Sequence, residues 1–384
     1  MLRLKFGIFL LLISITSISF AIEINVRIYT DIALKSIKIT PLSGKYVIYN
    51  KDTKVLDLYK NNSVDVLITE GKIKLVKEGE IIGVYENINF SAEGFLNTFN
   101  LKSIDPVIKD RVYDDGFQIS VENSKFKIIN VVELEHYVAG VVESEGGIKK
   151  NVEFLKLQAI ISRTYAISNL RKHIKEEAFN LCDNVHCQLY RGRCTNSLIM
   201  MATSQTNGDI IIDQHNKPIS AAFHSNCGGK TVNSEDVWSI ETSYLKSVKD
   251  TFCLKQSHAK WIKKIPVNKW LEYLSANYNY PVTDSLMKKE ALSYKQKTRQ
   301  VYFDENPNIH LKKIRSDFKF NSTFFSLDQQ GDTLIFNGNG YGHGVGLCQE
   351  GAMKMVDYGW TLKKIIQFYY KDVTIINITE LKNQ

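Results

Sequence analysis

The chain has 384 residues, of which 44% are hydrophobic and 23% charged, so it can build an ordinary core and suggests about two domains. Its formal net charge is +8, but the lysines are spread along the chain without a polybasic run. This spread argues against a nucleic-acid partner and favours an acidic polymer or an anionic surface.

The N-terminus has the pattern of a secretory signal peptide. Arg3 and Lys5 are basic, residues 6–18 are nearly all apolar, and Ser19 and Ala21 are small residues spaced for cleavage. We expect residues 1–21 to be a signal peptide and the protein to act in the periplasm or on the outer side of the membrane. An uncleaved anchor is the alternative, although the apolar run is short for a membrane span.

Residues 22–104 predict a β-rich N-terminal region. Ile24–Ile28 and Val64–Ile68 alternate apolar and polar residues, which is the period of a half-buried strand. Lys45–Tyr49 is also rich in strand-forming residues. Nothing in this region has the pattern of a chemical site.

Residues 105–257 hold the densest set of motifs. Strands are expected near Phe117–Val121 and Phe126–Val132. A long helix is expected from Val152 to about Leu170, because this stretch has no Gly or Pro, and Asn151 is placed to cap it. Its apolar residues populate nearly every face, so the helix is expected to be buried.

The remainder divides into a lysine-rich insertion and a return to the core. Residues 258–316 have helical patches at Asn268–Ala276 and Ser285–Ser293 and are expected to form an inserted helical elaboration. Residues 317–384 predict strands, a glycine run and two helices, the second capped by Thr361. The whole chain is therefore expected to be an α+β protein.

Four glycines alternate with other residues from Gly340 to Gly346. Glycine weakens regular structure, so such a run is expected where backbone turns sharply or approaches another surface closely. We interpret it as the wall of a site, with a plain surface loop as the alternative. It is not a nucleotide-binding loop, because it lacks the G-x-x-x-x-G-K-[ST] pattern.

Six separated motifs occur in a characteristic order: Leu134–Glu145, Leu157–Ala166, Cys182–Tyr190, Phe223–Thr231, Val237-Trp238 with Tyr244-Leu245, and Gly340–Ala352. Together they resemble the SpoIID/LytB domain family over roughly residues 114–375, with 258–316 as the weak part. The resemblance implies a mixed α+β SpoIID-like core. Two departures stand out: Gly146-Gly147 where the family usually has Met, and Cys348 where it usually has Ser.

The resemblance implies a peptidoglycan lytic transglycosylase. Such an enzyme cuts glycan strands that lack stem peptides between N-acetylmuramic acid and N-acetylglucosamine, and leaves a 1,6-anhydro end. The family's catalytic acid falls on Glu145, with Glu143 as the competing candidate. One carboxylate is enough for this chemistry, because the sugar's own 6-hydroxyl attacks, whereas hydrolysis usually takes two. The acid must be neutral near pH 7, which requires an apolar setting.

Six further residues are candidates for substrate binding. Arg163 is expected to grip the muramic-acid carboxylate at two points, with a structural ion pair as the alternative. The others are expected to lie in or near the sugar subsites, although His343 has a core histidine as its alternative. They are Gln158, Tyr165, Tyr341, His343 and Gln349.

Cys182, His186 and Cys187 are candidate ligands of a structural zinc site, because they have the side-chain types and the close spacing of zinc ligands. The resemblance implies zinc in this region, and His173 is a tentative fourth ligand, with His224 as its rival. A disulfide between two of Cys182, Cys187 and Cys194 is equally open, because an exported chain meets oxidising conditions. A separate disulfide is expected between Cys227 and Cys253. No organic cofactor is expected.

Three other functions stay open. The relatives of LytB type imply a non-enzymatic wall-binding protein that enhances an N-acetylmuramoyl-L-alanine amidase. A generic wall-binding module is the second, since Tyr and Phe number 19 each. The third is a Cys-His nucleophile formed by Cys348 and His343.

Overall fold

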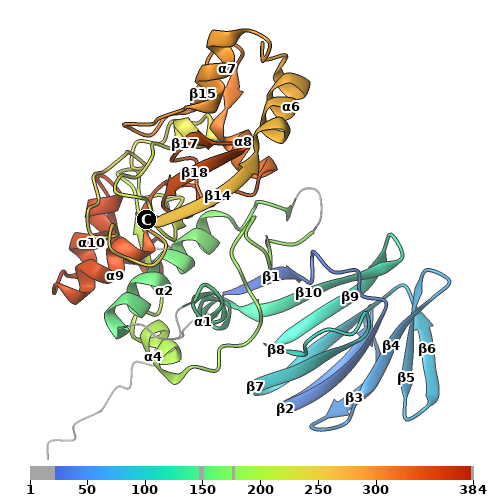
Figure 1. The fold of residues 1–384 in the computed structure, drawn as a ribbon. Helices are drawn as coiled ribbons and strands as arrows, with labels where there is room; N and C mark the ends of the chain where they lie inside the picture. The colour runs from blue at the N-terminus through green and yellow to red at the C-terminus, as the bar shows by residue number, and fades with distance from the viewer. Residues whose placement is uncertain (1–21, 147–150, 175–177, 382–384) are drawn as a thin grey trace, which may run out of the picture.

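The computed structural model describes residues 22–146, 151–174 and 178–381, and both helices and a large sheet are present, which confirms the α+β class. The expected signal peptide, residues 1–21, lies outside the described residues. Within the described ranges, no helix is both long and apolar enough to cross a bilayer. Figure 1 shows three lobes: a β lobe, a helical core and an upper lobe.

The β lobe is one strongly twisted sheet with the order β11-β1-β10-β9-β7-β2-β4-β5-β6, to which β3 adds on β2 and β8 on β7. Its strands include all those predicted before residue 133. They are β1 (Glu23–Ile28), β2 (Ser36–Asn50), β3 (Thr53–Tyr59), β4 (Val64–Thr69), β5 (Lys72–Lys77), β6 (Glu80–Tyr85), β7 (Asn87–Asp105), β8 (Arg111–Asp114), β9 (Gly116–Glu122), β10 (Lys125–Glu133) and β11 (Leu181–Cys182). The expected boundary at residue 104 falls inside β7, so the sheet continues to Glu133.

Aromatic side chains fill the inner face of this sheet. Phe90 and Phe99 stack on Phe117 with ring centroids 4.2 and 4.0 Å apart, and Tyr46 meets Phe99 edge-on at 5.9 Å. Buried aromatic pairs stabilise a core beyond their apolar area alone. The sheet is therefore a rigid base from which α1 begins directly after β10.

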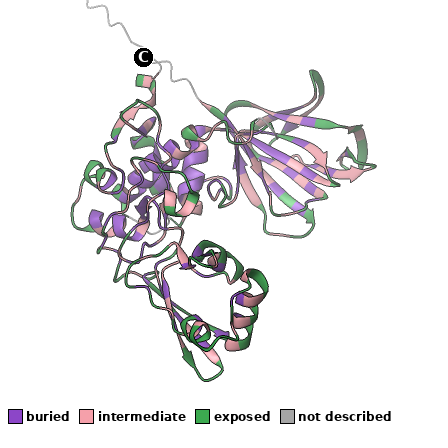
Figure 2. Cartoon of the chain, turned by 90° about the horizontal axis from the view of Figure 1, so that it is seen from above, coloured by how far each residue is buried: buried purple, intermediate pink, exposed green. Residues whose placement is uncertain are grey.

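The helical core surrounds α2, which is buried on nearly every face as predicted. Figure 2 shows that buried residues concentrate in the helices of this lobe. Asn151 caps α2 by accepting the Glu153 N–H, and Thr361 caps α10 by accepting the Lys364 N–H, so both predicted caps are confirmed. The elements of this lobe are α1 (Leu134–Ser144), α2 (Val152–Ser168), α4 (Ser197–Gln205), β12 (Asp209–Ile212), β13 (Phe223–His224), α5 (Glu235–Trp238), β19 (Leu347–Cys348), α9 (Gln349–Asp357), α10 (Leu362–Tyr369), β20 (Thr374–Asn377) and α11 (Ile378–Leu381).

The upper lobe has its own hydrophobic core, in which Trp270 is fully buried. Both predicted helical patches form helices there. Its elements are β14 (Lys260–Pro266), α6 (Val267–Tyr278), α7 (Ser285–Leu292), β15 (Tyr302–Asp304), β16 (Ile309–His310), α8 (Leu311–Asp317), β17 (Phe325–Gln330) and β18 (Thr333–Asn339). Because β14 pairs with β18, the lobe extends beyond the expected limit at residue 316. It leads directly into the glycine run.

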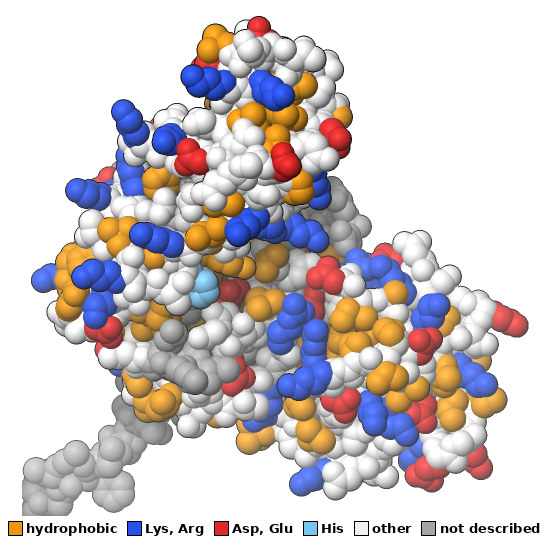
Figure 3. All heavy atoms as spheres, in the orientation of Figure 1, with side chains coloured by type: hydrophobic (Ala, Val, Ile, Leu, Met, Phe, Trp, Pro, Cys, Tyr) orange, Lys and Arg blue, Asp and Glu red, His pale blue; other side chains and the backbone are white. Residues whose placement is uncertain are grey.

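Charged side chains are scattered over the face shown in Figure 3, with Lys and Arg interspersed among Asp and Glu on all three lobes. No large field of one sign covers that face. This agrees with the dispersed lysines of the sequence.

Candidate functional site

The glycine run lies directly against the backbone around β13. Its four glycines have φ of 79° (Gly340), 110° (Gly342), 87° (Gly344) and 69° (Gly346), a region that other residues rarely adopt. A Cβ on Gly346 would collide with the carbonyl oxygen of Ala222, and one on Gly340 would come within 2.6 Å of the carbonyl oxygen of Asn226. The close approach expected from the sequence is therefore confirmed.

The same contact fixes the ring of His343. Its Nε2 donates to the Phe223 carbonyl at 2.9 Å, and its Nδ1 accepts the Val345 N–H at 3.1 Å, which defines a neutral tautomer. Burial, reinforced by the positive charge of Arg315, lowers the pKa of His343 to about 4. Its ring lies 5.2 Å from that of Trp238. His343 is thus a neutral, oriented wall rather than a base.

A cationic cavity of about 180 Å³ opens beside His343, where the upper lobe meets the core. Trp238 lines it together with three cationic residues, Arg299, Lys312 and Arg315, and one carboxylate, that of Asp236. Arg299 donates from Nη2 to the Cys227 carbonyl at 2.7 Å, while its Nε and Nη1 are buried without a hydrogen-bond partner. A buried, incompletely paired guanidinium is costly, so this cavity is suited to an anion.

Tyr341, in contrast, faces outward and is 44% exposed. Its ring meets that of His258 at 5.3 Å, and the His258 Nδ1 is hydrogen-bonded to the Glu350 carboxylate at 2.7 Å. Glu350 is buried and also accepts from Asn226 and Ser257. Sequence reasoning missed this His258–Glu350 pair, because the two residues are 92 positions apart and belong to no common motif.

Glu145 lies at the C-terminal end of α1, half-buried. Its Oε1 accepts the Leu189 N–H at 3.0 Å, and no ion pair to it is formed among the described residues. Burial raises the pKa of this carboxyl group, and the Leu189 hydrogen bond only partly opposes that rise. Glu145 also lies at the negative end of the α1 dipole, which disfavours the charged form of its carboxyl group. Glu145 thus has a setting that favours the protonated form of its carboxyl group over that of a solvent-exposed glutamate.

Glu143, the competing candidate, has both carboxylate oxygens engaged in hydrogen bonds within the protein. Its two oxygens accept three hydrogen bonds, from the Thr195 N–H at 3.0 Å, the Thr195 hydroxyl at 3.0 Å and the Asn196 N–H at 3.1 Å. Between the two glutamates, Ser144 Oγ accepts the Arg191 N–H at 2.9 Å. The end of α1 is therefore fastened to residues 189–196, and Glu145 is the acid that keeps one oxygen unengaged.

Arg163 does not face the surface. Its guanidinium is fully buried and forms a two-point ion pair with Glu135, Nε to Oε1 at 2.7 Å and Nη2 to Oε2 at 2.6 Å. Nη1 donates to the carbonyl oxygen of Asp209 at 3.0 Å. The alternative expected from the sequence, a structural ion pair, thus describes Arg163, and a substrate carboxylate has no access to it.

The other substrate-binding candidates separate into two places. Gln158 is buried in α2, and its Oε1 accepts from Nε2 of Gln349 at 3.3 Å, so these two side chains join α2 to α9. Tyr165 lies further along α2, where Lys172 donates both to its hydroxyl at 3.3 Å and to the His186 carbonyl at 2.7 Å. Tyr165 therefore borders the cysteine and histidine group, not the glycine run.

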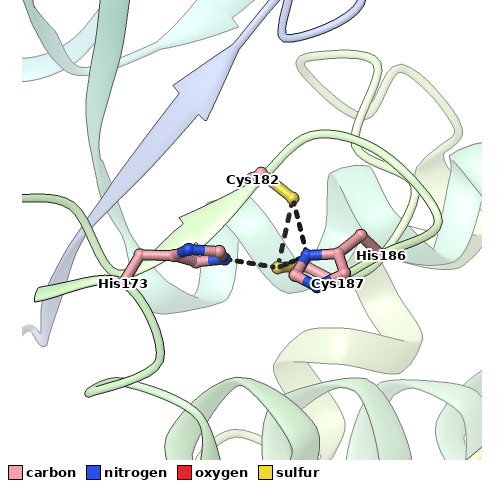
Figure 4. Close-up of side chains that lie close together, drawn as sticks. All are labelled: His173, Cys182, His186 and Cys187. Atoms are coloured by element: carbon pink, nitrogen blue, oxygen red, sulfur yellow. Dashed lines mark hydrogen bonds between the residues drawn. The ribbon is translucent and has the colours of Figure 1, made fainter. Parts of the chain in front are cut away.

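The predicted metal ligands do come together (Figure 4). The ligand atoms of His173, Cys182, His186 and Cys187, here called the Cys/His cluster, all lie within 4.8 Å of one another. The two sulfur atoms are 3.2 Å apart, and Cys187 Sγ lies 3.5 Å from the His173 Nε2. A tetrahedron with Zn–S bonds of about 2.3 Å and Zn–N bonds of about 2.0 Å has edges of similar size, so the donor set fits a closed zinc site.

All six cysteines are free. The disulfide expected between Cys227 and Cys253 is not formed, since their sulfur atoms are 3.4 Å apart. The suggested Cys348–His343 pair is not formed either. Cys348 Sγ accepts N–H groups from Cys227 and Gly351, while the His343 ring nitrogens bond to backbone groups.

Comparison with known proteins gives one family match and three similar proteins. Residues 122–212 match the family model SpoIID, described as Stage II sporulation protein. An uncharacterized protein of Brachyspira hyodysenteriae is 27% identical over 89% of this chain and 90% of its own. Stage II sporulation protein D of Bacillus subtilis is 28% identical over 67% of this chain and 78% of its own, and the amidase enhancer of the same bacterium is 25% identical over 62% and 40%.

Proposed function

Because the chain belongs to the SpoIID/LytB domain family, we propose that it is an exported peptidoglycan lytic transglycosylase with Glu145 as its single acid and base. Its substrate is a glycan strand without stem peptides, cut between N-acetylmuramic acid and N-acetylglucosamine. The observation that carries the proposal is the setting of Glu145: half-buried, with one backbone hydrogen bond and a raised pKa.

Glu145 performs two proton transfers in this mechanism. In its protonated form it gives a proton to the glycosidic oxygen as the bond to the muramic-acid carbon breaks. The carboxylate then takes the proton of the 6-hydroxyl of the same sugar, whose oxygen closes the 1,6-anhydro ring. No water is consumed, so a second carboxylate is not required. Glu145 gives up one proton and takes up one proton, so it is protonated again at the end of the cycle.

The cationic cavity supports the substrate class. Every second sugar of the strand is a muramic acid, and each muramic acid carries a carboxylate. A site away from Glu145 can therefore bind one of these carboxylates while Glu145 contacts the glycosidic bond that is cut. Arg299 and Arg315 supply the opposite charge, and Trp238 supplies an aromatic face of the kind that sugars pack on. This cavity takes the carboxylate-binding role that the sequence had suggested for Arg163.

The Cys/His cluster lies close in sequence to the backbone group that orients Glu145. Cys187 is two residues before Leu189, whose N–H is bonded to Glu145. Zinc held by Cys182, Cys187, His173 and His186 would be structural, since four protein ligands leave no open position. These residues then hold the segment that orients Glu145.

Product analysis is the direct test. The chain and its Glu145→Gln variant are incubated with peptidoglycan that has been stripped of stem peptides, and the products are examined by mass spectrometry. We expect anhydro-muramic ends from the wild-type chain alone. Reducing muramic ends would identify a hydrolase with a second carboxylate and would contradict the proposed chemistry.

A non-enzymatic enhancer of a wall amidase is the second candidate, and the similarity to the amidase enhancer favours it. It predicts no cleavage by the chain alone. It also predicts that Glu145→Gln stimulates a purified N-acetylmuramoyl-L-alanine amidase as well as the wild-type chain does. Loss of amidase stimulation in Glu145→Gln would exclude the non-enzymatic enhancer.

A further inference from the structure

A second group of metal-type ligands lies in the helical core, apart from the Cys/His cluster. Cys227, Asp250, Cys253 and Cys348, here called the Cys/Asp cluster, are all buried, and their ligand atoms lie within 4.8 Å of one another. Cys227 Sγ is 3.4 Å from Cys253 Sγ and 3.4 Å from Oδ2 of Asp250. These separations are close to the edges of a tetrahedral zinc centre, about 3.5–3.8 Å.

We propose that the Cys/Asp cluster binds a second divalent metal ion of the zinc type as a closed structural site. Three thiolates and one carboxylate fill four tetrahedral positions, and soft sulfur ligands select zinc over magnesium or calcium. Each thiol releases its proton to solvent on binding. The inference does not depend on the proposed function, because it concerns folding and not substrate.

Polar groups around the cluster are arranged as in the outer shell of a metal site. Cys348 Sγ accepts the Cys227 N–H at 3.3 Å and the Gly351 N–H at 3.4 Å, at the N-terminus of α9. Backbone N–H groups aimed at a sulfur, together with the positive end of a helix, favour thiolate. Asp250 is oriented as well, since Oδ2 accepts from the Tyr369 hydroxyl at 2.9 Å.

Two neighbours show that the space and the charge suit such a site. A Cβ on Gly351 would collide with Asp250 Oδ2 and the Tyr369 hydroxyl, so glycine is required there for the carboxylate to reach the sulfurs. Arg299 donates to the Cys227 carbonyl, and no carboxylate forms an ion pair with it within the described ranges. Three thiolates and one carboxylate around a divalent ion leave a net charge of about −2, and the buried guanidinium of Arg299 beside them offsets half of it.

The site would join three segments that are far apart in sequence. Cys227 follows β13, Asp250 and Cys253 lie between α5 and β14, and Cys348 ends β19 and is the N-cap residue of α9. These segments support the glycine run and Arg299. A metal ion there would cross-link the wall of the cationic cavity.

Metal stoichiometry tests the proposal. The full chain is produced with zinc, dialysed, and analysed for metal per chain by elemental mass spectrometry. We expect two equivalents for wild type, one for Cys348→Ala and one for His186→Ala. Cys194→Ala is the matched control, because this buried cysteine belongs to neither cluster, and it should retain two equivalents.

One equivalent in the wild-type chain, unchanged by Cys348→Ala, would overturn the proposal. So would a Cys227–Cys253 disulfide found by alkylation and peptide mapping of the unreduced protein. If Cys348→Ala does not fold, wild type with Co²⁺ decides. Thiolate-to-cobalt charge-transfer absorption should correspond to five thiolates for two sites, against two thiolates for the Cys/His cluster alone.

Discussion

Arg163 and Glu135 form a buried two-point ion pair, with N···O distances of 2.7 and 2.6 Å, between α2 and the start of α1. Glu135 is only one-fifth exposed. The pair also reaches the carbonyl oxygens of Asp209 and Thr203, so one guanidinium connects α1, α2, α4 and β12. Its role is to hold the helix that carries Glu145.

Removing the Arg163 charge should therefore affect stability first. We expect Arg163→Leu to lower the free energy of unfolding by about 3–5 kcal/mol, because it leaves Glu135 poorly solvated and unpaired. Urea denaturation measures the change. Arg191→Leu is the control, since Arg191 is about half exposed in its contact with Asp183 and should cost less than about 1 kcal/mol. Equal losses for both variants would contradict this role.

The raised pKa of Glu145 predicts an acidic activity profile. The protonated form is the one that starts the reaction, so the rate should fall as pH rises through the raised pKa of Glu145. Glu145→Gln should reduce glycan cleavage by about 10²- to 10⁴-fold and abolish that limb of the profile. An undiminished rate in Glu145→Gln would remove Glu145 from the mechanism.

The same pKa shift predicts an effect on stability with a definite sign. A carboxyl group whose pKa is raised on folding favours the folded state only while it is protonated, and this contribution is lost as pH rises through the folded pKa. Glu145→Gln should therefore unfold at a higher temperature than wild type at pH 7.5. The difference should vanish toward pH 4, as thermal scans across pH will show. A constant difference at every pH would contradict the burial argument.

Loss of metal from the Cys/His cluster should loosen the segment that holds Glu145. In His186→Ala we expect one metal equivalent to be lost and hydrogen exchange of the Leu189 amide to accelerate, because its partner geometry depends on Cys187 two residues earlier. His215→Ala is the control, as this exposed histidine lies outside both clusters. Unchanged exchange at Leu189 despite metal loss would separate the cluster from the acid.

The cationic cavity predicts a substrate-specific defect. We expect Arg315→Met to raise KM for glycan strands about tenfold or more, since a charge-assisted contact is worth roughly 1.5–3 kcal/mol. Strands whose carboxyl groups have been reduced to alcohols should show no such difference between the two proteins. Lys263→Met, on the exposed side of β14, is the charge-matched control. A similar rise with reduced strands would show that Arg315 acts only through the fold.

The glycine run predicts different costs at two glycines with similar backbone. Gly346 and Gly359 both have positive φ, 69° and 77°, so alanine is strained by about 1–2 kcal/mol at either position. Only Gly346 also faces a collision, with the carbonyl of Ala222, whereas nothing lies within 4 Å of a Cβ on Gly359. Gly346→Ala should thus be clearly less stable than Gly359→Ala in urea denaturation. Equal costs would mean that the close approach is not required.

Local sequence signals determined much of this protein. The alternation around Ile24–Ile28, the capped helix after Asn151 and the cysteine and histidine spacing of Cys182–Cys187 each act over a few residues, so they can be recognised without a fold. The glycine run likewise predicted a close backbone contact. The motif that resembles the SpoIID/LytB family predicted the acid at Glu145, and the structure shows that this side chain is half-buried.

Only the tertiary structure decided which charged side chains are paired inside the protein and which line a cavity. Arg163 became a buried ion pair, and the cationic cavity formed instead from Arg299 and Arg315, which lie in the region that the sequence left without a function. The Cys/Asp cluster likewise brings residues together across 121 positions, from Cys227 to Cys348. Charge pairing and metal-ligand geometry depend on distances between segments remote in sequence, and spacing along the chain does not encode them.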